Sequence, residues 1–168
     1  MTSPVKLVAA FCTLMLAFTP AAFAADDEHG AAGHKHIALF LGAGKEELPN
    51  GTEHDAKAVG FEFEYRLSDS WGIGAVVEAL DVDYRGNTVV VVPVSFHFGG
   101  GFRAFAGPGY EFKENKRKDK GVFRVGFGYE FHINEHWTIA PEVLNDFLGD
   151  DGKHGDTWLV GVAIGYGF

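Results

Sequence analysis

The chain is poor in cysteine, in basic residues and in long apolar segments, and each shortage narrows what the protein can be. Among 168 residues the sole cysteine is Cys12, which lies in an apolar N-terminal segment. Disulfide staples and thiol chemistry are therefore excluded for the rest of the chain. The 14 basic residues are outnumbered by 23 acidic ones, a balance that gives no electrostatic footprint for nucleic acid. No apolar run is long enough for a membrane-spanning helix.

The first 24 residues have the features of a secretory signal peptide. Lys6 supplies a positive charge, "LVAAFCTLMLAF" is a short apolar run, and "AFA" ending at Ala24 is a small-x-small cleavage site. Residues 25–35 are predicted to be a flexible tail rich in histidine and acidic residues. The remainder, 36–168, has the length of a single domain.

Glycine and aromatic residues are abundant, at 23 glycines and 14% aromatics, and large apolar residues alternate with small ones. The final segment, "WLVGVAIGYGF", alternates without a break. This period of two is typical of β-strands. Most of the expected strands have about ten residues, the length with which a tilted strand crosses a bilayer. They lie near 36–44, 57–67, 71–80, 88–98, 102–112, 122–131, 138–147 and 157–168.

The expected connections are of two alternating kinds. "KEELPNGTEHD", "DVDYRGN", "KENKRKDKG" and "LGDDGKHGD" are long and charged, whereas "SDS", "GGG" and "HINEHW" are short. Long loops at one end and tight turns at the other are typical of an up-and-down outer-membrane barrel. An even number of strands then places both termini on the periplasmic, short-turn side.

The distribution of charge between the two faces decides the fold class. If Phe168 faces outward, the same parity carried through each hairpin gives an outward set without any charged residue. The inward set contains Glu62, Glu64, Arg66, Glu78, His97, Arg103, Glu111, Arg124, Glu130 and Glu142. A soluble ligand-carrying barrel has the reverse arrangement, and an apolar exterior requires lipid as its solvent. We therefore predict an all-β, eight-stranded antiparallel up-and-down transmembrane β-barrel; the alternative is a soluble β-sandwich with an aromatic core.

Over 36–168 the chain resembles small bacterial outer-membrane β-barrel proteins of the eight-stranded, OmpA-like and opacity-protein-like kind. The most specific element is the C-terminal signature that the barrel-assembly machinery reads, here Phe168, Tyr166, Ile164 and Val162. The glycine often found five residues before the end is Ala163. The resemblance implies a monomer in the outer membrane, in contact with the lipid bilayer and lipopolysaccharide, and it implies no cofactor. It leaves the role open, because one barrel fold hosts pores, enzymes, adhesins and anchors.

The inward residues predict a hydrated network of ion pairs that plugs the lumen, because a barrel of eight strands is filled by its own side chains. On this interpretation the protein is not an enzyme and acts in envelope structure or in surface interaction through its charged loops. Six inward glutamates against three arginines leave open a narrow cation-preferring pore or a metal-linked transport module. The basic loop "KENKRKDKG" could contact the anionic sugars and phosphates of lipopolysaccharide.

Three further features of the sequence bear on function. Ser95 and His97 share the inward face, but the order differs from the His-x-Ser motif of outer-membrane lipid A deacylases, and Glu111 should lie roughly 26 Å from His97. A lipid-modifying enzyme is therefore the least favoured function.

Pro93 and Pro108 should lie side by side and weaken the strand pairing, either as a kink or as a lateral opening. Near the N-terminus, three histidines that could form a weak metal site are His29, His34 and His36.

Overall fold

The computed structural model describes residues 33–48, 50–82, 85–113, 119–150 and 153–168. The strands are β1 (Lys35–Glu47), β2 (Glu53–Arg66), β3 (Trp71–Val82), β4 (Arg85–Val91), β5 (Val94–Gly99), β6 (Phe102–Lys113), β7 (Lys120–Tyr129), β8 (Phe131–His132), β9 (Trp137–Asp150) and β10 (Lys153–Gly167). The described residues include no helix long and apolar enough to span a membrane. The predicted signal peptide and His29 lie outside the described residues.

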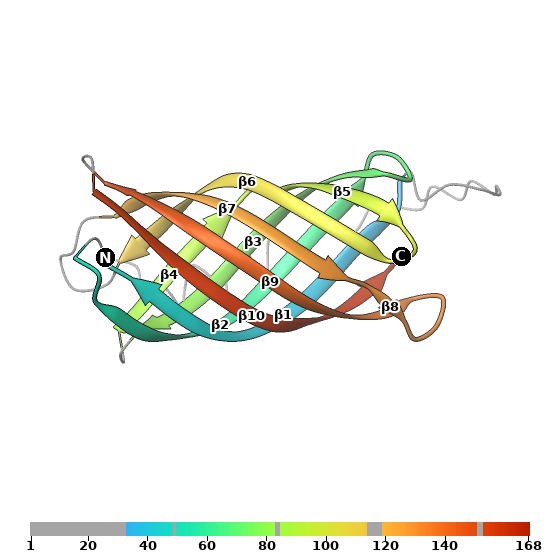
Figure 1. Ribbon diagram of the computed structural model, residues 1–168. Coiled ribbons are helices and arrows are strands. Elements are labelled where there is room, and N and C mark those ends of the chain that lie inside the picture. The colour runs from blue at the N-terminus through green and yellow to red at the C-terminus, as the bar shows by residue number, and fades with distance from the viewer. Residues whose placement is uncertain (1–32, 49, 83–84, 114–118, 151–152) are drawn as a thin grey trace. The chain divides into compact units, whose positions relative to one another are not determined.

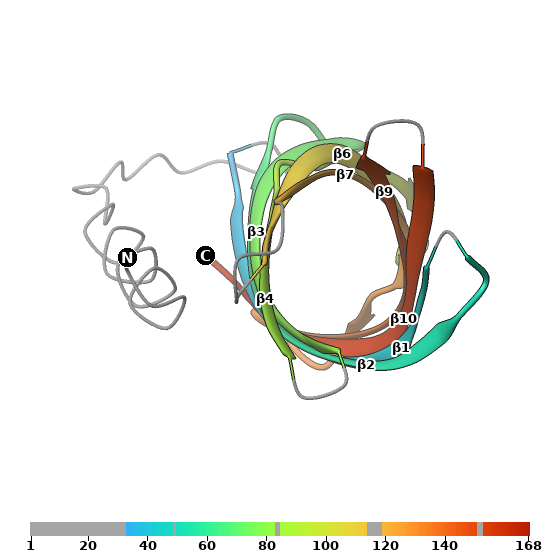
Figure 2. The same ribbon diagram turned by 90° about the vertical axis from the view of Figure 1, so that its left-hand side faces the viewer.

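These ten elements form the eight predicted spans of a closed antiparallel barrel (Figures 1 and 2). β4 and β5 are two halves of one span, since both pair with β3 and β6. β7 and β8 likewise share β9 as a neighbour. β10 pairs with β1 over twelve residues, from His36 opposite Gly167 to Glu47 opposite Asp156, and this pairing closes the ring.

Two of the eight spans are interrupted, one between β4 and β5 and the other between β7 and β8. At the first, Val92 and Pro93 separate β4 from β5, although the register on both sides still places Pro93 opposite Gly107. At the second, Glu130 separates β7 from β8, and its N–H bonds to the carbonyl of Gly101 on the β6 side at 2.7 Å. The proline pair was expected to weaken the first of these spans, whereas an unbroken strand was expected over 122–131.

Three of the connections expected to be long loops are shorter than predicted, because the strands extend into them. β1 and β2 remain paired as far as Glu47 opposite Glu53, so only residues 48–52 connect them. The hairpins β3–β4 and β9–β10 likewise extend into their charged segments. In these three hairpins the described charged residues thus belong mainly to strand extensions, because paired backbone satisfies the hydrogen bonds that a long loop would leave to solvent. We call this end of the barrel the hairpin end.

The opposite end carries the turns 67–70, 100–101 and 133–136, and we call it the turn end. Here the Lys35 N–H bonds to the Phe168 carbonyl and the Phe168 N–H to the Lys35 carbonyl, each at 2.9 Å. The C-terminus therefore lies at the turn end, as Figure 1 shows. The GGG turn is tighter than expected, with Gly99 opposite Phe102 and an irregularity after His97.

The predicted alternation of inward and outward faces is present on all eight spans. On β1, Leu39 and Leu41 are exposed whereas Phe40 is fully buried. On β9, Pro141 faces outward, and Asn145 lies opposite Trp158 on the same face. Asn145 is nevertheless buried, because Val125 and Trp158 flank it in the two neighbouring strands. The exposed apolar surface covers the outside of the barrel.

Inward glycines make room for large side chains in this narrow lumen. A Cβ on Gly42 or on Gly161 would lie within 2.6 Å of the Phe40 ring. A Cβ on Gly126 would lie 2.2 Å from the Phe105 ring. The glycines on the inner face therefore provide the space that large aromatic side chains occupy in the lumen.

Candidate functional site: the charged lumen

The inward charged residues lie in three clusters along the barrel. The turn-end cluster comprises Glu62, Glu64, Arg66, His97, Arg103, Glu130 and Glu142; the central cluster Glu78, Arg124 and Asp146; and the hairpin-end cluster Glu46, Asn87, Glu111 and Lys113. Apolar residues separate the clusters. On β9, Leu144 lies between Glu142 and Asp146. All ten predicted lumen residues therefore fall into one of these clusters.

The central cluster is a guanidinium enclosed by two carboxylates. Arg124 donates to both oxygens of Glu78, at 2.9 and 3.3 Å, and to both oxygens of Asp146, at 2.6 and 2.7 Å. None of the three side chains is more than 1% exposed. Bidentate pairs of this kind are among the strongest protein hydrogen bonds.

The turn-end cluster is built around Arg103, whose guanidinium stacks 4.7 Å from the Phe105 ring. Arg103 Nη2 pairs with Glu142 and lies 3.2 Å from Glu62. Its Nη1 lies 3.6 Å from Glu64. One oxygen of Glu142, Oε2, is buried without a hydrogen-bond partner among the described residues.

A second arginine and a histidine extend this cluster toward the turn end. Arg66 binds Glu64 at 2.6 Å and Glu130 at 3.3 Å. His97 Nε2 lies 2.9 Å from Glu64 Oε1, and its Nδ1 lies 3.9 Å from Glu130. Each carboxylate thus has at least one nearby cation or imidazole, as the cost of burying charge requires.

The hairpin-end cluster contains residues that the sequence analysis missed. Lys113 Nζ lies 3.2 Å from Glu46 and 3.1 Å from Glu111, and Asn87 donates to Glu111 at 2.9 Å. Glu46 and Lys113 were missed because the strands were expected to end at residues 44 and 112. Asp146 of the central cluster lies on an inward position of the predicted strand 138–147, so its parity already indicated its place.

The hydrolase reading finds no support in the geometry. Ser95 and His97 both hydrogen-bond to Glu64, so the carboxylate lies between them and no serine–histidine pair forms. Ser95 is only 2% exposed. The expected separation of Glu111 from His97 is supported by the register, since Glu111 lies opposite Val89 near the hairpin end. A nucleophile needs an adjacent base and access to substrate, and Ser95 has neither.

The proline pair lies where predicted, with a specific consequence for the backbone. Gly74 donates to the Pro93 carbonyl at 2.8 Å, and Val92 donates to the Pro108 carbonyl at 3.0 Å. Proline has no N–H, so the reciprocal bonds to the Gly74 and Val92 carbonyls are absent. Two ladder bonds are therefore missing at adjacent positions, on the two sides of one span.

The described part of the chain includes two of the three predicted metal-site histidines and all four residues of the predicted assembly signal. Among the described residues, no three His, Cys, Asp or Glu side chains are arranged to hold a metal ion. His34 and His36 lie at the start of the barrel, where His36 Nε2 is 3.0 Å from Thr138 Oγ1. At the C-terminus, Val162, Ile164 and Phe168 are exposed on the outer face, and Tyr166 packs 5.2 Å from Trp137.

Together, the closed ladder, the apolar exterior and the charged interior define a small transmembrane β-barrel. No family model matches the chain, and no curated protein matches its sequence. Solved structures are similar in fold. The N-terminal barrel domain of OprF from Pseudomonas aeruginosa has a TM-score of 0.60 at 17% identity, covering 83% of this chain and all of that domain.

Two proteins of other bacteria show the same likeness. Neisserial surface protein A (NspA) has a TM-score of 0.59 at 10% identity, with 83% of this chain and 99% of that one covered. Ail, the attachment invasion locus protein of Yersinia pestis, has a TM-score of 0.56 at 14% identity, covering 82% and 99%. The chain therefore has the fold of small outer-membrane barrels, and at these identities the likeness shows the fold alone.

Proposed function

We propose that the protein is an integral outer-membrane barrel that acts as a closed, non-enzymatic anchor and presents its charged hairpin end at the cell surface. The observation that carries this proposal is the close packing of the central part of the lumen. Arg124, Glu78 and Phe40 are 0% exposed, and Leu144 is 1% exposed. Water cannot touch these inward side chains from either end, as it would in an open channel.

The two ends of the barrel support the orientation. At the hairpin end, charged residues point outward and are exposed, among them Lys45, Glu47, Glu53, Asp55 and Lys57. At the turn end, exposed aromatic residues such as Trp71, Phe131 and Trp137 continue to the last strand positions, where interfacial rings are expected. Charged strand extensions outside the bilayer favour a surface-facing hairpin end, with both ends of the barrel chain in the periplasm.

This placement implies partners. The exterior faces the lipid bilayer, and the charged hairpin end would meet lipopolysaccharide, including its phosphates through the basic segment near Lys113 and Lys120. Residues 1–24 would direct export as a cleaved signal peptide, and Phe168 with its alternating neighbours would be read by the barrel-assembly machinery. A complete ring leaves no open strand edge, which favours a monomer.

The test is the conductance of the refolded mature protein in a planar bilayer. A folded barrel, confirmed by heat-modifiable gel migration, should produce no steady single-channel steps. Regular steps from correctly folded protein would contradict the closed anchor. Altered lipid A acylation in cells that overproduce the protein would contradict the non-enzymatic role.

The second candidate is a narrow cation-preferring pore or a metal-linked transport module. It is favoured by the surplus of acid in the three clusters, where eight carboxylates face four arginine and lysine side chains. Cation-selective steps that disappear in Glu62→Gln, Glu78→Gln or Glu130→Gln would establish it. Steps unaffected by all three substitutions would show a current that does not pass along the lumen.

A further inference from the structure

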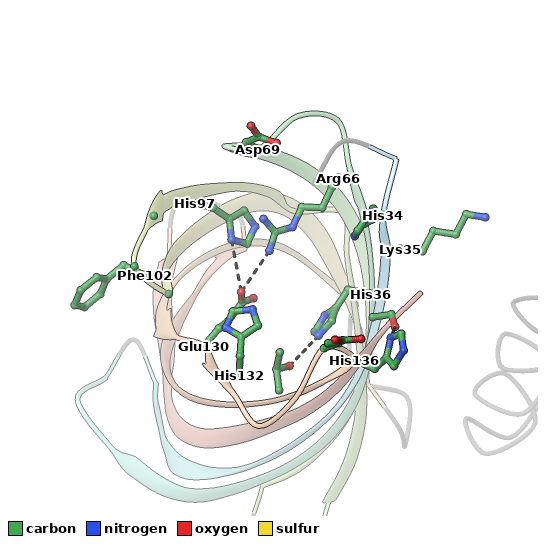
Figure 3. A pocket seen from close by; sticks show the side chains of 16 residues that line it. His34, Lys35, His36, Arg66, Asp69, His97, Phe102, Glu130, His132 and His136 are labelled. Atoms are coloured by element: carbon green, nitrogen blue, oxygen red, sulfur yellow. Dashed lines mark hydrogen bonds and ion pairs between the residues drawn. The ribbon is translucent and has the colours of Figure 1, made fainter. Parts of the chain in front are cut away.

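A polar pocket of about 320 Å³ opens at the turn end, outside the closely packed part of the lumen. Its walls come from the start of β1, the end of β2, β5, β8, the turn 133–136 and the first residues of β9. In Figure 3, dashed lines join Arg66 and His97 to the carboxylate of Glu130, and His36 and His132 line the same pocket. This volume lies at the lower end of the range for small-molecule sites.

The pocket is rich in hydrogen-bond donors that the lumen network does not use. His132 is exposed and makes no side-chain hydrogen bond or ion pair with another described residue. His36 uses only Nε2, toward Thr138, and its other ring nitrogen has no partner among the described residues. An imidazole supplies an N–H donor in its neutral form and two when protonated.

One wall consists of main chain alone. Gly99, Gly100 and Gly101 line the pocket with φ angles of 81°, 61° and 91°. A side chain is strained in this left-handed region, and a Cβ on Gly99 or Gly100 would point into open space. Three successive glycines therefore leave the main chain of this wall uncovered by side chains.

The charges of the pocket select the class of ligand. Glu130 is already compensated, because Arg66 lies 3.3 Å and His97 3.9 Å from it. The contacts of Glu130 show that a guanidinium and an imidazole hold a carboxylate in this pocket. Asp69 and Glu135 also line the pocket, together with Lys35. The two carboxylates repel a doubly charged anion more strongly than a singly charged one.

We propose that this pocket binds a small organic carboxylate that reaches it from the turn end. The ligand carboxylate lies beside Glu130, accepts hydrogen bonds from His36 and His132, and is attracted by Arg66. The glycine wall supplies backbone donors. This site is independent of the proposed anchor role, because it needs neither conduction nor contact with the cell surface.

The test uses two probes that differ only in the acid group: N-acetylalanine and its neutral amide. The mature protein, isotope-labelled and refolded in a neutral maltoside detergent, is titrated with each probe while the imidazole and Gly99–Gly101 amide NMR signals are followed. We expect saturable shifts confined to the pocket with the acid, and at least about tenfold weaker binding of the amide, because a charge-assisted hydrogen bond is lost. His132→Gln and His36→Gln should each weaken the acid, whereas His54→Gln at the other end should not.

Three outcomes would overturn the proposal. The acid and the amide could bind equally, the acid could give no saturable shift, or binding could be unchanged in both pocket variants. Inorganic phosphate is a third probe, and binding of phosphate as tight as that of the acid would also overturn the proposal, because the site would then be a general anion site. Heat-modifiable migration of every variant confirms that a loss of binding is not a loss of folding.

Discussion

Replacing Arg124 by methionine tests the central cluster most directly. The side chain is of similar length but cannot donate, so Glu78 and Asp146 lose four hydrogen bonds of 2.6 to 3.3 Å while remaining buried. Breaking a buried ion pair by removing one partner costs about 3–5 kcal/mol, because the other charge is left uncompensated. We expect a loss of this size in the free energy of unfolding, measured by urea titration in phospholipid vesicles with tryptophan fluorescence.

Two controls give this measurement its meaning. Lys45→Met breaks an ion pair with Glu53 in which both side chains are more than half exposed, so solvent screens the pair and we expect little change in the free energy of unfolding. In the Arg124→Met background, adding Glu78→Gln and Asp146→Asn removes the stranded charges and should recover most of the loss. A loss in Arg124→Met no larger than that in Lys45→Met would refute the buried central cluster.

Three further measurements address the packing, the proline pair and the C-terminus. Gly126→Ala should cost about 1–3 kcal/mol, because the new Cβ meets the Phe105 ring at 2.2 Å, and much less in a Phe105→Ala background; equal costs in both backgrounds would contradict the contact. Pro93→Ala supplies the missing donor to the Gly74 carbonyl, so the alanine amide should be protected in hydrogen exchange in detergent, and rapid exchange there would show that the ladder is not restored. Phe168→Ser should lower the yield of heat-modifiable barrel in cells while leaving refolding in detergent largely intact, whereas equal loss in both would point to a folding defect.

The faces of the barrel could be predicted because strand parity is carried through each hairpin without loss. One outward residue, Phe168, is enough to place Arg124 and Glu78 inside, far away in the sequence. The clusters could not be predicted, since they depend on how far the strands shift against one another around the ring. Arg124 meets Glu78 across the lumen, although the two belong to strands that do not pair.

Strand ends were the least predictable feature. Charge in "KEELPNGTEHD" indicated a loop, but Lys45 pairs with Asp55 as regular β-structure and Glu46 turns inward to Lys113. A charged residue is compatible with a strand that leaves the bilayer, where both faces have water or an ion-pair partner. Hydropathy therefore locates the apolar band of a barrel strand, while hydrogen bonding determines its length.

The two ends of the lumen differ in what they can receive. From the turn end a solute can reach His132, which is exposed, and Glu130, which is 7% exposed. Further in, Leu144 and Arg124 are 1% and 0% exposed, so the passage stops between the turn-end and central clusters. The central cluster shows that charge in this lumen also serves packing, because Arg124 is paired with Glu78 and Asp146 where no solute reaches. The turn-end cluster is the part of the charged lumen that a polar solute entering from this end can meet.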